Sequence, residues 1–104
     1  MQIYHLISVT ALPGKWGEAR KGALAAIRYL NENSSYLGKY EILHPAGGPN
    51  NLHYWLCHYQ SMADAENDMT LRGKDEEWHK VFRENMSDFV DVDNITSQEF
   101  KVGA

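Results

Sequence analysis

Residues 52–59 read LHYWLCHY and hold five ring-bearing side chains together with the only cysteine of the 104-residue chain. Successive side chains of a β-strand point to opposite faces, so this stretch has two sides. One side carries His53, Trp55, Cys57 and Tyr59. The other side carries Leu52, Tyr54, Leu56 and His58. Because both sides are rich in large apolar or aromatic groups, the stretch predicts a strand that is covered on both faces.

Other strands and a helix are predicted before and after this stretch. Residues 2–11 are rich in β-branched and aromatic side chains and stop at a Pro-Gly pair, as a strand does before a turn. Residues 15–33 place apolar side chains at intervals of three and four, which is typical of an amphipathic helix. Residues 95–102 are expected to form a closing strand.

A hairpin is predicted to lead into the central stretch. Residues 36–44 favour a strand, and residues 45–51, PAGGPNN, are dense in turn formers that join it to a strand at 52–60. No helix follows the two adjacent glycines, so this loop lacks the helix N-terminus of a phosphate site. We expect the loop to lie at the rim of a pocket.

The segment after residue 60 predicts a helix in two pieces. Ser61 precedes the first piece and Asp64 follows three residues later, a variant of the capping box. Gly73 is expected to end this piece near Arg72, and acidic residues 75–77 begin the second, where the helix dipole favours them. An apolar stripe is expected to follow, formed by Trp78, Val81, Phe82, Phe89 and Val90.

The order β-α-β-β-α-β predicts one α+β domain over residues 1–104. We expect a ferredoxin-like fold, a four-stranded antiparallel sheet with both helices on one face and the first and third strands in the centre. The face without helices would still show Tyr4, Leu6, Tyr54 and Leu56. Such a patch predicts a partner, and a homodimer packed sheet to sheet would cover it.

Charge and composition argue against several classes of partner. The formal net charge is −4, whereas nucleic acids and anionic membranes attract a basic face. A single cysteine forms no internal disulfide. No apolar run approaches the roughly 20 residues of a membrane span, and the N-terminus lacks the regions of a signal peptide. These features predict a cytoplasmic protein that binds neither nucleic acid nor membrane.

Four segments in order along the chain resemble the dimeric α/β-barrel superfamily. Residues 4–15, YHLISVTALPGK, are similar to the opening strand and turn of the NIPSNAP family and of the antibiotic-biosynthesis monooxygenases. Residues 58–66, HYQSMADAE, resemble the entry into the second helix. Residues 75–82, DEEWHKVF, resemble the Asp-Pro-Glu-Trp segment of NIPSNAP proteins and the His-x-x-Phe of the stress-responsive Dabb group, which includes a plant polyketide cyclase. Residues 95–102 fit the closing strand.

The resemblance implies a homodimeric α/β barrel with a pocket between the concave sheet face and the helices of each subunit. It does not imply one reaction, because the superfamily includes cofactor-free oxygenases, cyclases, haem-degrading enzymes, chlorite-type enzymes and proteins of unknown role. The NIPSNAP opening strand usually carries Glu, Arg and an aromatic residue where this chain has His5, Ile7 and Val9. The cyclase's catalytic tyrosine has no clear counterpart near Asp68 or Met69.

Three histidines are candidates for acid–base chemistry. The cyclase's catalytic histidine falls on His79, and its two pocket-lining strand histidines fall on His5 and His53. If the central strands pair centre to centre, four residues separate the two strand histidines. The alternative is that each is a core or surface histidine with ordinary hydrogen-bond partners. No HExxH pattern or i, i+4 histidine pair suggests a metal, so we expect neither a metal nor another cofactor.

An apolar pocket is expected to surround these histidines. Its predicted ligand-binding residues are Ile7, Val9, Trp55, Tyr59, Trp78 and Phe82. Trp16 would complete an aromatic wall. Plain core packing is the alternative for each of these side chains.

Three functions are compatible with these observations. The first is a cofactor-independent monooxygenase- or cyclase-like enzyme that acts on an apolar or aromatic small molecule. The second is a non-catalytic NIPSNAP-like dimer that binds a ligand or a protein. RNA binding is a third, since RNA-recognition domains share the topology and place aromatic residues where Tyr4 and Tyr54 stand, but the acidic charge argues against it. The sequence leaves open whether the protein is an enzyme.

Overall fold

The computed structural model describes residues 2–47 and 51–103. Its strands are β1 (Ile3–Thr10), β2 (Lys39–Leu43), β3 (Leu52–Tyr59) and β4 (Thr96–Lys101). Its helices are α1 (Trp16–Glu32), α2 (Met62–Lys74) and α3 (Glu76–Asn85), with a short 3-10 helix, η1 (Val92–Asn94), before β4. The predicted order of elements, with a second helix in two pieces, is confirmed. Residues 48–50 of the predicted hairpin loop lie outside the described residues.

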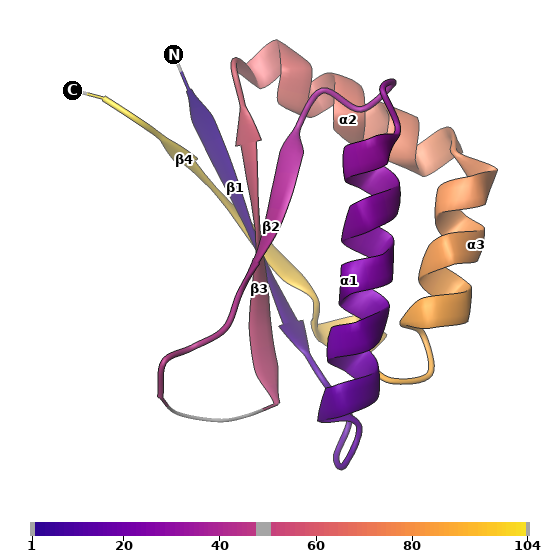
Figure 1. Ribbon diagram of the computed structural model, residues 1–104. Helices are drawn as coiled ribbons and strands as arrows, with labels where there is room; N and C mark the ends of the chain where they lie inside the picture. The colour runs from indigo at the N-terminus through magenta and orange to yellow at the C-terminus, as the bar shows by residue number, and fades with distance from the viewer. Residues whose placement is uncertain (1, 48–50, 104) are drawn as a thin grey trace.

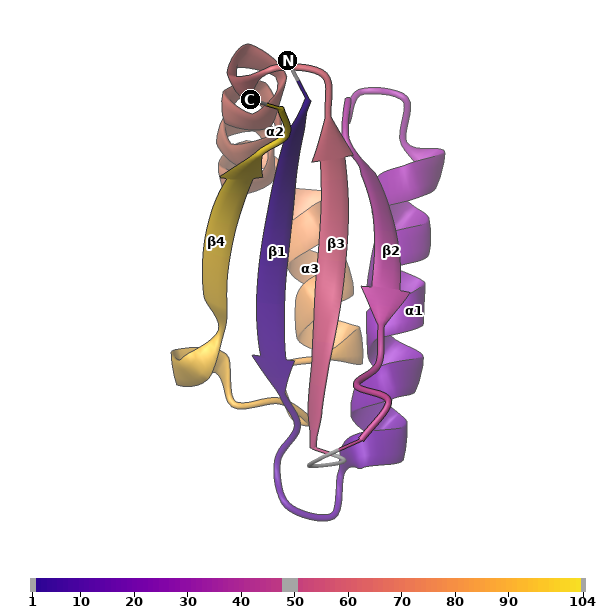
Figure 2. The same ribbon diagram turned by 90° about the vertical axis from the view of Figure 1, so that its left-hand side faces the viewer.

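The four strands form one antiparallel sheet in the order β2-β3-β1-β4. The α-helices all lie on one face of it (Figure 1), and the described residues place no helix on the opposite face (Figure 2). β1 and β3 are therefore the central strands, as a ferredoxin-like fold requires, and the predicted fold is confirmed. Within residues 2–47 and 51–103, no helix combines the length and the apolar character needed to cross a bilayer.

The burial of β3 follows the alternation of its sequence. Its odd-numbered side chains are buried beneath the helices, whereas its even-numbered side chains are half-buried on the other face. In the β1–β3 register, His5 lies opposite Cys57 and Val9 lies opposite His53. The predicted assignment of side chains to the two faces and the four-residue offset between the strand histidines are both confirmed.

β2 is shorter than predicted. The expected strand over residues 36–44 is wrong at its start, because β2 begins at Lys39. The backbone N–H groups of Leu37 and Gly38 donate to the carboxylate of Asp68 on α2, at 2.9 and 2.8 Å. A buried side chain thus satisfies donors that a strand would otherwise pair, and the chain enters the sheet after them.

The start of α2 agrees with the prediction and its end does not. The Ser61 hydroxyl accepts a hydrogen bond from the backbone N–H of Asp64 at 3.2 Å, which confirms the cap. The expected break at Gly73 is wrong. An exposed glycine costs a helix only about 1 kcal/mol, and α2 continues through it. The break falls at Asp75, whose carboxylate accepts from the N–H of Trp78 and begins α3.

α3 ends before the predicted apolar stripe is complete. Its last residue is Asn85, so Phe89 and Val90 lie beyond the helix. Val90 forms an isolated bridge with Ala11 and brings the chain back to the sheet. The apolar residues beyond Asn85 therefore serve the connection to β4.

α3 packs against α1 (Figure 1). Ala19, Ala23 and Ala26 are fully buried along α1, and Gly22 meets the end of α3. A Cβ atom at Gly22 would overlap the backbone carbonyl of Asn85. Glycine at this position therefore sets how closely α3 can lie against α1.

Candidate functional site

A group of polar side chains lies between the sheet and α2, on the face predicted to line a pocket. We call this set the polar cluster: His5, Tyr40, Cys57, Tyr59 and Arg72. His5, Cys57 and Tyr40 form one row across β1, β3 and β2. Tyr59 follows two residues after Cys57 on the same buried face. α2 contributes Arg72, which meets the two tyrosine hydroxyls.

Hydrogen bonds join Arg72 to both tyrosines. Its Nη1 donates to the Tyr40 hydroxyl and, at 3.4 Å, to the Tyr59 hydroxyl, and these two hydroxyls lie 3.1 Å apart. The guanidinium also lies 5.9 Å from the centre of the Tyr40 ring, a cation–π distance. Among the described residues, no carboxylate oxygen comes within 4.0 Å of Arg72. Its partners are therefore neutral groups.

Burial keeps the neighbours of Arg72 uncharged. It raises the pKa of Tyr59 to about 12, although the hydrogen bond from Arg72 acts in the opposite direction. Burial also raises the pKa of Tyr40 and of the Cys57 thiol. Burial acts to lower the pKa of Arg72, but the oxygens of Tyr40 and Tyr59 outweigh it, and this pKa is raised. At neutral pH the polar cluster therefore carries one positive charge among neutral groups.

His5 has an imidazole nitrogen without a partner. The residue is 6% exposed, and its Nδ1 is buried with no hydrogen bond to any of the described residues. Burial lowers the pKa of His5 and the charge of Arg72 lowers it further, whereas Glu99 on β4 acts in the opposite direction. The imidazole is therefore neutral at pH 7. Its Nδ1 can accept or donate a hydrogen bond, depending on the tautomer.

His53 is a histidine whose lone pair is already used. Its Nε2 accepts a hydrogen bond from the indole N–H of Trp55 at 3.0 Å, and the residue is 2% exposed. Burial lowers the pKa of His53 to about 4, with a further contribution from His44, whose ring centre lies 6.2 Å away. To take a proton at Nε2, His53 would have to release the indole.

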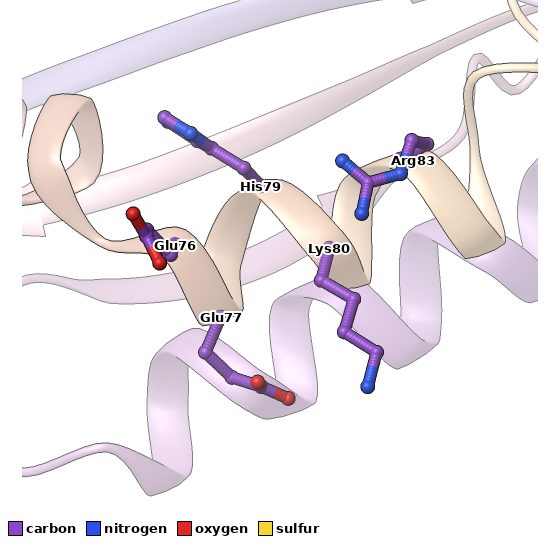
Figure 3. Close-up of a pocket in the computed structure, with 5 residues that line it drawn as sticks. All are labelled: Glu76, Glu77, His79, Lys80 and Arg83. Atoms are coloured by element: carbon purple, nitrogen blue, oxygen red, sulfur yellow. The ribbon is translucent and has the colours of Figure 1, made fainter.

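His79 lies apart from the two strand histidines. It is exposed on α3 and lines a surface hollow of about 410 Å³. The other residues of this hollow come from the same helix: Glu76, Glu77, Lys80 and Arg83. Figure 3 shows the His79 ring pointing away from the side chains of Glu77 and Lys80. The structure places the three candidate histidines in three different surroundings.

The predicted ligand-binding residues form an aromatic wall between the sheet and α3, which we define as Trp55, Trp78 and Phe82. The Trp55 and Trp78 rings meet edge to face at 6.4 Å, and Trp78 lies 6.0 Å from Phe82. Trp78 and Phe82 are half-buried, whereas Trp55 is 4% exposed. The remaining predicted members are half-buried Ile7, which faces Trp55 in the register, and the buried Val9 and Tyr59.

Trp16 lies outside the aromatic wall, so its predicted place in it is wrong. It is the first residue of α1 and is 39% exposed. The centre of its ring lies 6.3 Å from the centre of the His44 ring, and the Arg20 guanidinium lies over the Trp16 ring, 5.6 Å from its centre. The helical period correctly gave its direction around α1 but not its position at the helix end.

Two acidic residues with structural roles were not predicted. Asp68 is fully buried and accepts from backbone N–H groups before β2. Asp75 was expected in a solvated helix start, but it accepts the hydroxyls of Tyr29 and Tyr36 at 2.6 and 2.8 Å. Burial acts to raise the pKa of Asp75, and these hydrogen bonds outweigh it and lower that pKa. Asp75 therefore ties α3, and with it Trp78, to the rest of the domain.

Arg72 also escaped sequence reasoning, although a signal was present. It lies four residues after Asp68, on the face of α2 that also carries the buried Ala65. Charged side chains at helix positions that face the core are rare unless they are paired or functional.

In the part of the chain that the structure describes, no three His, Cys, Asp or Glu side chains are grouped so as to hold a metal ion.

Comparison with solved structures shows which proteins share this fold. A NIPSNAP-like domain protein of uncharacterised function from Burkholderia xenovorans superposes with a TM-score of 0.78 at 16% identity, over 99% of this chain and 86% of that one. SnoaB, a cofactor-independent oxygenase from Streptomyces nogalater, superposes as a point mutant with a TM-score of 0.67 at 8% identity, over 97% and 92%. The protein therefore has the ferredoxin-like fold that NIPSNAP-like proteins and such oxygenases share.

A third solved structure has the same fold. An antibiotic biosynthesis monooxygenase, described as putative, from Deinococcus radiodurans gives a TM-score of 0.65 at 12% identity, over all of this chain and 94% of that one. No family model matches the sequence, and the comparison with curated proteins found no match. The likeness is thus one of fold, of the type found in NIPSNAP-like and antibiotic-biosynthesis-monooxygenase-like proteins.

Proposed function

We propose that the protein binds an apolar or aromatic small molecule between the sheet and the helices and converts it without a cofactor, with His5 as the proton-transferring group. One observation carries this proposal. The buried and unpartnered Nδ1 of His5 belongs to the same sheet face as the aromatic wall. His5 and Ile7 are adjacent on that face of β1, and Ile7 lies opposite Trp55. A ligand ring against the wall would therefore lie next to His5.

The chemistry follows from a neutral imidazole in a dry site. Such a group can take a proton from an enol or phenol and leave an electron-rich anion. That anion can react with O₂ as the oxidant, so that one oxygen atom becomes a new carbonyl on the ring and the other leaves as water with the two hydrogens lost from the ring carbon and the hydroxyl. Alternatively, a carbon of the anion can attack a carbonyl, whose π bond breaks to give an alkoxide that takes the proton back from the imidazolium. The cofactor-independent oxygenase among the structural neighbours supports the first reaction, and both need the same proton acceptor.

The other two histidines rank behind His5 as proton acceptors. The lone pair of His53 is held by Trp55, and His79 is exposed in a hollow formed by α3 alone. The resemblance keeps His79 as a candidate. Oxygen uptake with an electron-rich naphthol such as 1,3-dihydroxynaphthalene separates them: we expect His5→Gln to remove uptake above the uncatalysed rate and His79→Gln to retain it. The reverse result would assign the proton transfer to His79.

Binding has its own test, which does not need turnover. Isothermal titration with 2-naphthol should show binding by the wild-type protein and about tenfold weaker binding by Trp78→Ala, because a ring contact is lost. Trp16→Ala is the matched control, since Trp16 is exposed and lies outside the wall. Equal weakening by both substitutions, or no binding to the wild type, would overturn the proposed pocket.

We also propose that the protein is a homodimer through the open sheet face. Leu6 lies opposite Leu56 at the centre of this face, and Tyr54 lies opposite Ser8. These residues are half-buried in a single chain, so a second sheet would cover apolar surface. Sedimentation should give twice the mass of one chain, and Leu56→Glu should give a folded monomer. A monomeric wild type would contradict this proposal.

A non-catalytic ligand-binding dimer is the second candidate. It is favoured by the hydrogen bond that occupies His53 and by the exposure of His79, which leave one histidine for acid–base work. Binding of 2-naphthol without oxygen uptake or cyclisation of any naphthol tested would support this second function over the first.

A further inference from the structure

We propose that the polar cluster binds a carboxylate group of the ligand, so that the ligand class is an aromatic or apolar carboxylate. This inference rests on the proposed function, since it names the ligand of the same site. Its observations, however, are separate from those that support the aromatic wall. They are the charge of Arg72, the neutral hydroxyls around it and the guanidinium nitrogens that no described residue uses.

The first step is the charge of Arg72. Its guanidinium contacts only neutral oxygens and a ring, with no carboxylate within 4.0 Å in the described chain. Asp68 lies one turn earlier on α2, but its oxygens accept from the N–H groups of Leu37 and Gly38. A half-buried cation with neutral partners favours an anion from outside the chain.

The second step is the donor set. Nη1 of Arg72 donates to the tyrosines, and within residues 2–47 and 51–103 the other nitrogens of its planar fork have no hydrogen-bond partner, so they can meet a carboxylate. His5 is not part of this set, because its unpartnered Nδ1 is the proton acceptor of the proposed function. One positive charge balances one carboxylate. A phosphate, with a charge near −2, would require a second cation.

The third step is access. All residues of β4 are exposed. Figure 2 shows α1 behind β2, at the opposite edge from β4, and α2 behind the upper end of β4. Ile7 and Arg72 are half-buried. The proposed ligand would enter from the β4 edge, where Glu99 lies opposite His5. This exposed carboxylate would oppose an anion weakly, because solvent screens it.

Spacing then links the two parts of the site. His5 and Ile7 are two residues apart on β1, and Cys57 and Trp55 are two apart on β3. This separates the polar cluster from the aromatic wall by about 7 Å along the strands. A carboxylate attached directly to a fused aromatic ring spans that distance, with its ring on Trp55 and its charge at Arg72.

The test compares a charged ligand with its neutral isostere. Isothermal titration at constant pH should show 2-naphthoate binding about tenfold or more tightly than 2-naphthamide, as expected for charge-assisted hydrogen bonds. Arg72→Met, which keeps a similar volume without the charge, should remove this difference and leave the affinity for 2-naphthamide unchanged. Arg72→Lys should retain part of it. Arg83→Met is the matched control, because Arg83 is exposed on α3, and it should retain all of it.

Each outcome separates this inference from the proposed function. If 2-naphthoate and 2-naphthamide bind the wild type equally, the carboxylate site is wrong and the aromatic pocket stands. If neither binds, the pocket itself is contradicted. If Arg83→Met removes the preference as fully as Arg72→Met, the preference reflects overall charge and the assignment to the polar cluster fails.

Discussion

Two buried histidines on the same face of the sheet have opposite hydrogen bonding. His53 on β3 accepts the indole N–H of Trp55, whereas Nδ1 of His5 on β1 meets no partner in the described chain. Both are neutral at pH 7, because burial lowers the pKa of each. The difference is that Arg72 stands near His5 without a counter-charge. Burial alone thus does not distinguish the two histidines, and the unused nitrogen near Arg72 is the reason why we propose His5 as the proton acceptor.

The largest expected effect is a loss of stability in acid, caused by His53. The pKa of His53 falls from 6.5 to about 4 on folding. Between pH 6.5 and pH 4, His53 is therefore protonated in the unfolded chain and neutral in the folded chain. Stability is therefore full above pH 6.5 and is lost as the pH falls toward 4, by about 3 kcal/mol. Urea unfolding at pH 7 and pH 4 measures this loss.

His53→Gln isolates the contribution of His53. Glutamine can still accept the indole N–H through its carbonyl oxygen but does not titrate. We expect this variant to lose most of the dependence on pH that lies between 6.5 and 4. An unchanged dependence would place the titrating group elsewhere and would contradict the burial of a neutral His53.

Close packing beneath the polar cluster should give the next largest effect. A Cβ atom at Gly38 would lie 2.5 Å from Sγ of Cys57 and 2.6 Å from Cε1 of Tyr59. We expect Gly38→Ala to lower the free energy of unfolding by about 2 kcal/mol. Gly47→Ala is the control, because nothing lies within 4 Å of its Cβ position, and it should change stability by less than about 0.5 kcal/mol.

The smallest expected effect is the difference in stability between variants that remove one or the other histidine. His53→Leu should lower the free energy of unfolding by about 1–2 kcal/mol, because it leaves the buried indole N–H of Trp55 without an acceptor. His5→Leu breaks no hydrogen bond and should change stability by less than about 1 kcal/mol. Chemical denaturation at pH 7 compares the two variants. Equal losses would mean that His5 has a partner in the folded chain.

The sequence predicts the sheet more completely than the site, for physical reasons. Period-two alternation allowed one assignment of faces in β3, and the structure agrees with it. Element ends depended on tertiary contacts, as when Asp68 shortened β2 and Asp75 moved the helix break. Contacts such as that of Asp68 join residues that are far apart in the chain, so they cannot be predicted from the pattern of neighbouring residues.

The site residues divide in the same way. Trp55, Trp78 and Phe82 were found from strand and helix periods, and they do meet. Arg72 and Tyr40 were missed, since their meeting depends on how α2 crosses the sheet. The sequence did contain one local indication of a charged site: Asp68 and Arg72 are four residues apart, on the face of α2 that is buried.

The central claim is that a ligand lies between the aromatic wall and the polar cluster. The indole N–H signals in a ¹H–¹⁵N correlation spectrum test it directly, because the three tryptophans occupy different places. On addition of 2-naphthoate, we expect the signals of Trp78 and Trp55 to shift and that of the exposed Trp16 to stay. A shift of Trp16 alone, or of none of the three, would contradict the account.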